Sequence, residues 1–266
     1  MAAPHGRHRP RKRFGQHFLA PEWAAKLVAA IGPREGDTFL EIGPGRGAIT
    51  RLLAARAARV VAVEVDRDLA AALRDMAPGT LEIVESDILA LDLGSLDLPG
   101  ATRIAGNLPY NISSPILFQI LEAQRRLSRF ADATLMLQKE VADRLTAPVG
   151  TKDYGLLTIF TALEAIVSRQ LTLPPGAFHP PPQVTSAVVR LTFLPPESRP
   201  DVPATFTPMV RALFAMRRKT ILNGLKAPAS AAGPSPAEAI ARAGLDPRQR
   251  PEQLTVGQLL TLARAI

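Results

Sequence analysis

The sequence predicts an α/β fold, with a mixed, mostly parallel sheet over residues 14–195 and a small all-α domain over residues 196–266. Three observations predict it. Short apolar segments, typical of buried strands, alternate with helical patterns through the first domain. A glycine-rich turn, Gly43 to Gly47, joins the first of these segments directly to a helix. Beyond a proline-rich linker that begins at Leu194, only helical patterns remain.

The early elements follow from where the apolar periodicity starts and stops. A helix is predicted from about Glu22 to Ile31, because apolar residues recur on one face and Gly32 and Pro33 end the pattern. A further helix begins at Ser113 or Ser114, whose hydroxyls are suited to cap it. Between these two helices the pattern predicts four strands, at residues 38–42, 60–65, 81–85 and 103–106. It also predicts one helix, at about residues 48–57.

The later elements are predicted in the same way. In the first domain we expect two buried strands, at residues 132–138 and 186–193. Between them we expect a mixed-charge helix at 139–146, an apolar element at 154–165 and a stiff proline-rich loop at 173–182. In the second domain we expect one long helix at Met209–Leu225 and a flexible Ala/Ser/Pro loop at 227–236. Two short helices, at 236–243 and 256–265, follow the loop.

Composition narrows the class of protein. A chain of 266 residues is long enough for a catalytic domain of roughly 190 residues with a small appendage. No apolar window is long enough to span a bilayer. The excess of basic residues gives a net charge of +8 and a pI near 10.5, which favours a polyanionic partner, with nucleic acid ahead of a membrane surface.

Cysteine is absent, which excludes disulfides, thiolate metal sites and a cysteine nucleophile and fits a reducing compartment such as the cytoplasm. The four histidines make no pair at metal-ligand spacing, so no metal is expected. Residues 1–13 are rich in Arg, His and Pro without an apolar run, so we expect a flexible basic tail and not a secretory signal. Such a tail either touches phosphates or is simply solvated.

Polar or glycine residues follow four predicted strands where each strand ends. Gly43 follows the first, and Glu64, 21 residues later, ends the second at the spacing that offers a carboxylate to ribose hydroxyls. Asp87 follows the third and is placed to accept the amino group of an adenine ring, and Asn107 ends the fourth. Ligands of open α/β sheets bind at this edge. Each residue alone is explained as a packing glycine or a solvated carboxylate, but the ordered set predicts an adenosine-containing cofactor.

The stretch Asn107-Leu-Pro-Tyr110 is the predicted site of chemistry. The Asn107 side-chain carbonyl and the backbone carbonyl of Leu108 could accept both N–H bonds of a nucleobase amine and turn its lone pair toward an electrophile. Tyr110 supplies a stacking face, and Phe178 in the proline-rich loop could press on the opposite face of the base. Alternatively, the tetrapeptide merely ends a strand and Phe178 fills a core gap. The tetrapeptide suits methyl transfer to an amine and has no obvious part in hydride transfer.

Three consecutive cations lie in the predicted long helix: Arg217, Arg218 and Lys219. Because they spread around much of a helix, some could lie on phosphate groups of a nucleic acid. The alternative is a solvated basic face.

Seven ordered blocks resemble the ribosomal RNA small-subunit adenine N6,N6-dimethyltransferase family (KsgA/RsmA). They are Arg13-Phe-Gly-Gln-His-Phe-Leu19, Glu41-Ile-Gly-Pro-Gly-Arg-Gly47, Glu64-Val-Asp-Arg-Asp-Leu69, Gly106-Asn-Leu-Pro-Tyr-Asn-Ile-Ser113, Leu137-Gln-Lys-Glu-Val141, Phe178-His-Pro-Pro-Pro-Gln-Val184 and Arg217-Arg-Lys-Thr220. The resemblance implies a Rossmann-like S-adenosylmethionine-dependent methyltransferase domain followed by a small helical domain. The cofactor residues that it implies are His17, Leu19, Gly43, Glu64, Asp87 and Asn107.

The resemblance further implies dimethylation of two adjacent adenines in the 3′-terminal hairpin of 16S rRNA, in the small ribosomal subunit or its precursor. The protein is then expected to act as a cytoplasmic monomer without a membrane partner. Many members carry Asn where this chain has His17, and both side chains can hydrogen-bond a cofactor carboxylate. The alternatives are a large-subunit rRNA adenine methyltransferase, a non-catalytic RNA-binding ribosome assembly factor and a DNA adenine methyltransferase.

Overall fold

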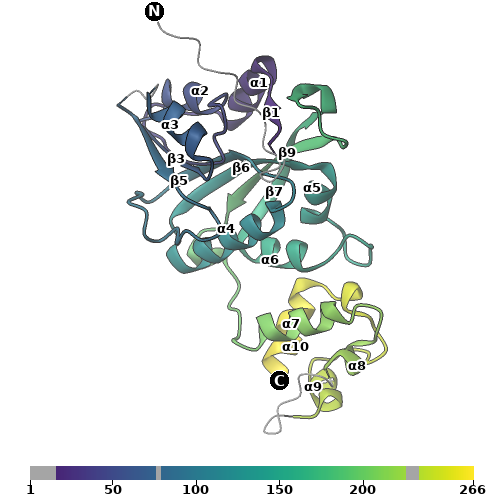
Figure 1. The fold of residues 1–266 in the computed structure, drawn as a ribbon. Coiled ribbons are helices and arrows are strands. Elements are labelled where there is room, and N and C mark those ends of the chain that lie inside the picture. Colours follow the sequence, from purple (N-terminus) through teal and green to yellow (C-terminus); the bar gives the residue numbers. More distant parts are fainter. Residues whose placement is uncertain (1–15, 76–78, 226–233) are drawn as a thin grey trace, which may run out of the picture. The chain divides into compact units, whose positions relative to one another are not determined.

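The computed structural model describes residues 16–75, 79–225 and 234–266 (Figure 1). These residues divide into two compact units. The first unit runs up to Ala142 and resumes at Val167–Phe193, and the second comprises Asp143–Ile166 and Leu194–Ile266. Residues 143–166 therefore lie in the second unit, although they precede the boundary placed at residue 195 from the sequence. The predicted basic tail, residues 1–13, lies outside the described residues.

The first unit holds most of the sheet. Its elements are β1 (Phe18–Leu19), α1 (Pro21–Ile31), β2 (Thr38–Ile42), α2 (Thr50–Ala54), β3 (Arg59–Glu64), α3 (Arg67–Asp75), β4 (Leu81–Glu85), β5 (Thr102–Asn107), α4 (Ser113–Leu127), β6 (Phe130–Gln138), β8 (Phe178–His179) and β9 (Ser186–Phe193). Two elements cross from one unit to the other, α5 (Lys139–Leu145) and β7 (Ala165–Leu173). The second unit holds α6 (Leu156–Glu164), α7 (Phe206–Ala215), α8 (Ile221–Leu225), α9 (Pro236–Arg242) and α10 (Val256–Ala265).

The main sheet has the strand order β4-β3-β2-β5-β6-β9-β7. Strands β2 to β6 pair in parallel, and β9 pairs antiparallel with β6. The mixed, mostly parallel sheet predicted from the sequence is therefore confirmed. In the register, Ile42 of β2 lies opposite Val63 of β3 and Gly106 of β5. The carboxyl ends of these strands consequently lie level at one edge of the sheet.

The core of the first unit lies between the sheet and α1 with α2. Leu27 and Val28 of α1 and Leu53 of α2 are buried against Phe39 and Met136 of the sheet. Figure 1 shows α4 on the other side of the sheet from α1 and α2. Burial of apolar side chains against both faces of the sheet holds the strand ends in place, because each fully buried side chain stabilises the fold by roughly 1.5–3 kcal/mol.

The predicted helix Met209–Leu225 is wrong as a single helix, because α7 ends at Ala215 and α8 begins at Ile221. A continuous helix would need the N–H of Ile221 to bond to the carbonyl four residues earlier. That N–H instead donates to Gln249 O at 2.8 Å. A tertiary hydrogen bond thus holds the first residue of α8 outside a continuous helix, in a stretch where the helical periodicity continues.

Among the strands and α-helices of the described residues, four were not predicted: the short strands β1 and β8, the helix α3 and the strand β7. β1 and β8 are two residues long and pair with each other, with Leu19 opposite Phe178. A strand of two residues has no periodicity to detect, so only the partner reveals it.

Gly106 of β5 is required by close packing between strands. A Cβ atom at this position would lie 2.6 Å from the backbone oxygen of Ile42. We expect Gly106→Ala to lower the free energy of unfolding by about 1–3 kcal/mol, because β2 and β5 must separate. Urea denaturation measures this loss. Gly100→Ala is the matched control, because a Cβ there meets nothing within 4 Å; an equal effect of both substitutions would contradict the packing argument.

Candidate active site

A cavity of about 390 Å³ opens at the carboxyl edge of the sheet, in the first unit. This volume lies within the range of small-molecule sites. The walls come from six segments of the chain: the residues before α1, the loop after β2, the end of β3, the residues after β4, the loop after β5 and His179 of β8. The residues that line it include Gln16, His17, Leu19, Gly43, Gly45, Glu64, Asp87, Asn107, Leu108, Tyr110 and His179. All four predicted strand-end residues therefore line one cavity.

The glycine-rich turn brings its backbone close to the cavity. Gly45 has a φ of 58° and Gly47 a φ of 78°, a left-handed conformation that glycine adopts without steric cost. A Cβ at Gly47 would also lie 2.8 Å from Leu73 of α3. The N–H of Gly45 points at β3 and donates to Glu64 Oε2 at 2.9 Å. The turn is thus shaped by its glycines and fixed by the carboxylate of the neighbouring strand.

Glu64 is a buried carboxylate at the end of β3, with 5% of its surface exposed. Its Oε1 accepts a hydrogen bond from the N–H of Asp66 at 2.9 Å. Burial raises the pKa of Glu64, and the N–H groups of Asp66 and Gly45 oppose that shift. A carboxylate oxygen has a second lone pair beyond each of these bonds, so Glu64 can still accept hydroxyl donors from a ligand.

Asp87 lies exposed beyond the end of β4, on the cavity wall. The N–H of Leu89 donates to its Oδ1 at 2.9 Å and so fixes the carboxylate in a local turn. This bond restricts the rotation of the Asp87 side chain, whose carboxylate can accept a further hydrogen bond.

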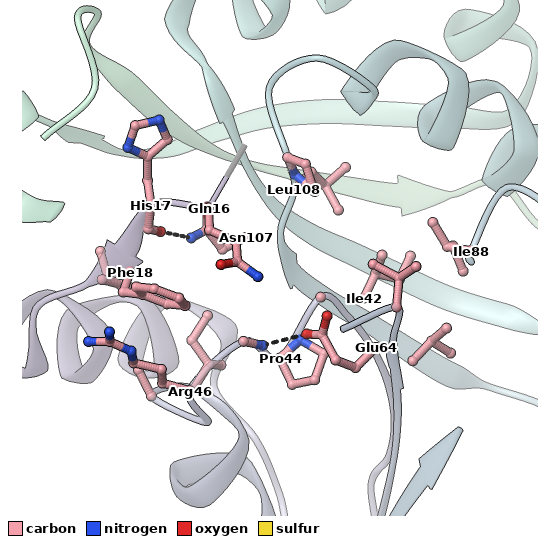
Figure 2. A pocket seen from close by; sticks show the side chains of 18 of the residues that line it. Gln16, His17, Phe18, Ile42, Pro44, Arg46, Glu64, Ile88, Asn107 and Leu108 are labelled. Carbon is pink, nitrogen blue, oxygen red and sulfur yellow. Dashed lines mark hydrogen bonds between the residues drawn. The ribbon is translucent and has the colours of Figure 1, made fainter. Parts of the chain in front are cut away.

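The side-chain amide of Asn107 is oriented by the backbone of His17. Its Nδ2 donates to His17 O at 3.0 Å, and Figure 2 marks this bond and the bond between Gly45 and Glu64 with dashed lines. A carbonyl can only accept, so the amide nitrogen must face His17 and the amide oxygen must face away from it. The next residue, Leu108, is 1% exposed, and its N–H donates to Met136 O of β6 at 3.1 Å. The 107–108 corner is therefore fixed by two separate bonds.

The ring of Tyr110 is half-buried and lies on the cavity wall. It stacks on the imidazole of His17, with ring centroids 5.5 Å apart and planes inclined by 24°. The imidazole Nδ1 donates in turn to Pro180 O at 2.7 Å. Burial raises the pKa of the Tyr110 phenol. His17 thus contacts two of the residues predicted to carry the chemistry, Asn107 through its backbone and Tyr110 through its ring.

Phe178 has a different environment from the other predicted residues. It is 4% exposed and belongs to the same apolar cluster as Leu19, opposite which it pairs in the β1–β8 ladder. Its neighbour His179, not Phe178, lines the cavity. The structure thus brings the segments of His17 and Phe178 together, with the Phe178 ring in the core. Contact between Phe178 and a base stays a prediction.

Two buried polar residues behind the cavity wall, Glu41 and Ser186, were not predicted as functional from the sequence. Glu41 on β2 is 1% exposed, and burial together with the nearby carboxylate of Glu64 raises its pKa to about 8. Ser186, fully buried at the start of β9, lies with its Oγ 2.5 Å from the hydroxyl oxygen of Tyr110. Glu41 opens the motif Glu41-Ile-Gly-Pro-Gly-Arg-Gly47 and is a charged residue in an otherwise apolar strand, a pattern that could have indicated a buried carboxyl group. Ser186 offered no such signal.

The predicted cations lie in the second unit and differ from one another. Arg217 is half-buried, and its guanidinium donates to the backbone oxygens of Thr151 and Lys152 at 2.8 and 2.5 Å. Arg218 and Lys219 are exposed. Arg217 therefore holds a loop of its own unit, whereas its two neighbours face solvent.

Residues 16–75, 79–225 and 234–266 contain no group of three or more His, Asp or Glu residues placed to hold a metal ion. Within the same ranges, no helix combines the length and the apolar character that crossing a membrane requires.

Comparison with known proteins gives one consistent result. The model of the family described as ribosomal RNA adenine dimethylase matches residues 7–266. Ribosomal RNA small subunit methyltransferase A of Acidobacterium capsulatum is 42% identical, over 100% of this chain and 94% of that protein. The protein of the same name from Geobacter metallireducens is 44% identical, over 97% of this chain and 96% of that protein.

Solved structures agree with the sequence relatives. A dimethyladenosine transferase from Plasmodium falciparum superposes with a TM-score of 0.73 and is 26% identical, covering 92% of this chain and 96% of that chain. The 23S rRNA methyltransferase ErmE superposes with a TM-score of 0.65 at 27% identity, covering 93% and 98%.

Proposed function

The chain belongs to the ribosomal RNA adenine dimethylase family, and from that premise we propose that it transfers methyl groups from S-adenosylmethionine to the exocyclic N6 of two adjacent adenines. The proposed target is the 3′-terminal hairpin of 16S rRNA, in the small ribosomal subunit or its precursor, during ribosome biogenesis in the cytoplasm. We further propose that the protein acts as a monomer. The observation that carries the chemistry is the amide of Asn107, held by His17 at the edge of the cavity that Glu64 and the glycine turn line.

The residues around the cavity fit S-adenosylmethionine. The left-handed Gly43 and Gly45 allow backbone to approach a ligand closely, and the buried Glu64 carboxylate suits ribose hydroxyls. Asp87 suits the amino group of the adenine ring. The full proposed set is His17, Leu19, Gly43, Glu64, Asp87 and Asn107, of which all six line the cavity. When bound, the cofactor supplies an electrophilic methyl group on a sulfonium.

The proposed chemistry is direct displacement on that methyl group. The oxygens of Asn107 and Leu108 accept the two N–H bonds of the target amine, so its lone pair is turned out of the ring system toward the methyl carbon. The bound cofactor would supply the methyl group to the amine nitrogen and would leave as S-adenosylhomocysteine. The extra N–H proton becomes acidic only after the methyl group has arrived and then passes to water, so no strong general base is needed.

Tyr110 supplies the face on which the flipped-out adenine stacks. Its ring now stacks on His17, with centroids 5.5 Å apart, which is closer than the roughly 7 Å that a base inserted between two stacked rings needs. The base must therefore use the other face of Tyr110 or displace the His17 imidazole.

Sequence identity favours the small subunit over the large subunit as the source of the substrate. The relatives named for the small subunit are 42% and 44% identical to this chain, whereas ErmE, named for 23S rRNA, is 27% identical. A non-catalytic assembly factor is the other alternative, and titration with S-adenosylmethionine tests it, because such a factor has no need to bind the cofactor.

The proposed function is tested with unmethylated small subunits and isotopically labelled S-adenosylmethionine. We expect label on N6 of two adjacent adenines of the 3′-terminal hairpin. Large subunits and fully methylated small subunits are the matched controls and should remain unlabelled. Label on large-subunit rRNA alone would favour the ErmE-like activity, and the absence of both label and cofactor binding would favour the assembly factor.

Arg218 and Lys219 are proposed to contact RNA phosphates, with Arg217 as the third residue of the group. Because Arg217 holds the loop of Thr151, the cleaner test is Arg218→Gln with Lys219→Gln. We expect the slope of log K against log salt for rRNA binding to flatten by about 0.9 per lost duplex phosphate contact. Filter binding at several salt concentrations measures the slope.

The control for this experiment is Arg248→Gln, which removes an exposed cation of the same unit that is already paired with Asp246 at 3.1 Å. We expect no change of slope in that variant. If the double substitution also leaves the slope unaltered, Arg218 and Lys219 are a solvated basic face.

A further inference from the structure

The hydroxyl of Tyr110 does not face solvent but meets a buried partner on another strand. Its oxygen lies 2.5 Å from Ser186 Oγ, and Ser186 is 0% exposed. The two residues are 76 positions apart in the sequence. A buried phenol oxygen without a partner costs about 1–3 kcal/mol, so this bond favours one orientation of the ring.

The two partners differ in how firmly they are held. Ser186 is the first residue of β9 and lies opposite Gln138 in the β6–β9 ladder, and the adjacent Thr185 O accepts the N–H of Lys139. Tyr110 lies in the loop between β5 and α4. The hydrogen bond therefore ties a loop residue to the frame of the sheet.

We propose that Ser186 is a positioning residue for the methyl transfer, which holds the phenol of Tyr110 and thereby sets the plane on which the target adenine stacks. This inference rests on the proposed function. Tyr110 is only three residues from Asn107, so a tilt of its ring moves a stacked amine relative to the amide oxygen that must accept its N–H. Small misplacements of reacting groups lower rates strongly, because the attacking lone pair must lie in line with the methyl carbon.

The kinetic test compares Ser186→Ala, Tyr110→Phe and the double variant on unmethylated small subunits. Either single change removes one side of the same bond, so each is expected to lower kcat/KM by about 3- to 10-fold. The double variant should be no worse than the poorer single variant, because the bond can be lost only once. The Kd for S-adenosylmethionine should stay unchanged. Wild-type kcat/KM in Ser186→Ala, or losses that multiply in the double variant, would overturn the inference.

A spectroscopic test reports the bond without catalysis. The chain has two tyrosines, Tyr110 and Tyr154, so in a Tyr154→Phe background the phenol absorbance follows Tyr110 alone. Burial raises the pKa of Tyr110 and the bond to Ser186 lowers it. We therefore expect Ser186→Ala to raise the phenol pKa further. An unmoved pKa would contradict a bond between the two residues in solution.

Thr102→Val is the matched control for loss of a buried hydroxyl. Thr102 is 0% exposed at the start of β5, and its hydroxyl donates to Pro99 O at 2.7 Å. This variant should lose stability without moving the phenol pKa or kcat/KM.

The two tests also separate the two proposals. A wild-type protein that leaves rRNA unmethylated refutes the proposed function while the titration still tests the bond. An active wild type with an indifferent Ser186→Ala variant refutes this inference alone.

Discussion

Replacing Asn107 by Ala is expected to lower kcat for adenine methylation by about 10³-fold or more. The amide oxygen that accepts the amine N–H is lost, and the lone pair returns to conjugation with the ring. Much of the affinity for S-adenosylmethionine should remain, because Glu64, Asp87 and the glycine turn are untouched. We expect the Kd of the cofactor to rise by less than about 10-fold.

Single-turnover methylation of small subunits measures the chemical step, and calorimetric titration measures the Kd. Asn111→Ala is the matched control, because Asn111 is an exposed amide four residues further along the same loop and should leave both quantities unchanged. Asn107→Asp is a sharper variant. It keeps an acceptor oxygen but cannot donate to His17 O as a carboxylate, so it should lose the orientation that the 3.0 Å bond provides. Undiminished methylation by Asn107→Ala would refute the assignment.

The convergence of Gly43, Glu64, Asp87 and Asn107 on one cavity could be predicted because it depends only on order and parallel pairing. Each residue follows a strand with a clear apolar pattern, and the carboxyl ends of parallel strands share one edge. The positions of these residues in space therefore followed from the sequence once the strands were recognised. No knowledge of individual side-chain contacts was needed.

The surroundings of these residues could not be predicted in the same way. The orientation of the Asn107 amide depends on the backbone of His17, 90 positions earlier, and the Tyr110 phenol depends on Ser186. Phe178 lies in the core because a two-residue strand places it opposite Leu19. These contacts join segments that carry no periodic signal, so pattern alone does not place their side chains.

Glu41 shows how burial within the site region affects the whole fold. It lies on β2, directly before Ile42 and the glycine turn, and both of its carboxyl oxygens are buried without a hydrogen-bond partner in the described part of the chain. An ionised carboxylate in such surroundings is strongly disfavoured, so burial raises its pKa to about 8. The folded protein therefore keeps a proton on Glu41 at pH values where the unfolded chain has lost it.

Exchange of Glu41 for Gln is expected to change the pH dependence of stability. Because the pKa of Glu41 is higher in the folded than in the unfolded state, its ionisation lowers the free energy of unfolding as pH rises from about 4.5 to about 8. Gln cannot ionise, so the stability of Glu41→Gln relative to wild type should increase over this window by an amount on the order of a few kcal/mol. Urea denaturation at pH 5, 6, 7 and 8 measures the difference. Titrating groups that do not interact with Glu41 cancel, because both proteins contain them.

Glu85→Gln provides a control of opposite sign. Arg67 and Arg74 lower the pKa of Glu85, so the wild-type carboxylate stabilises the fold above its unfolded pKa and loses that contribution as pH falls. The Glu85→Gln variant should therefore approach wild-type stability toward low pH and fall below it near neutrality, opposite to Glu41→Gln. Parallel stability curves for wild type and Glu41→Gln would mean that Glu41 ionises in the folded state with an ordinary pKa, and that water or a cation reaches its carboxyl group beneath the glycine turn.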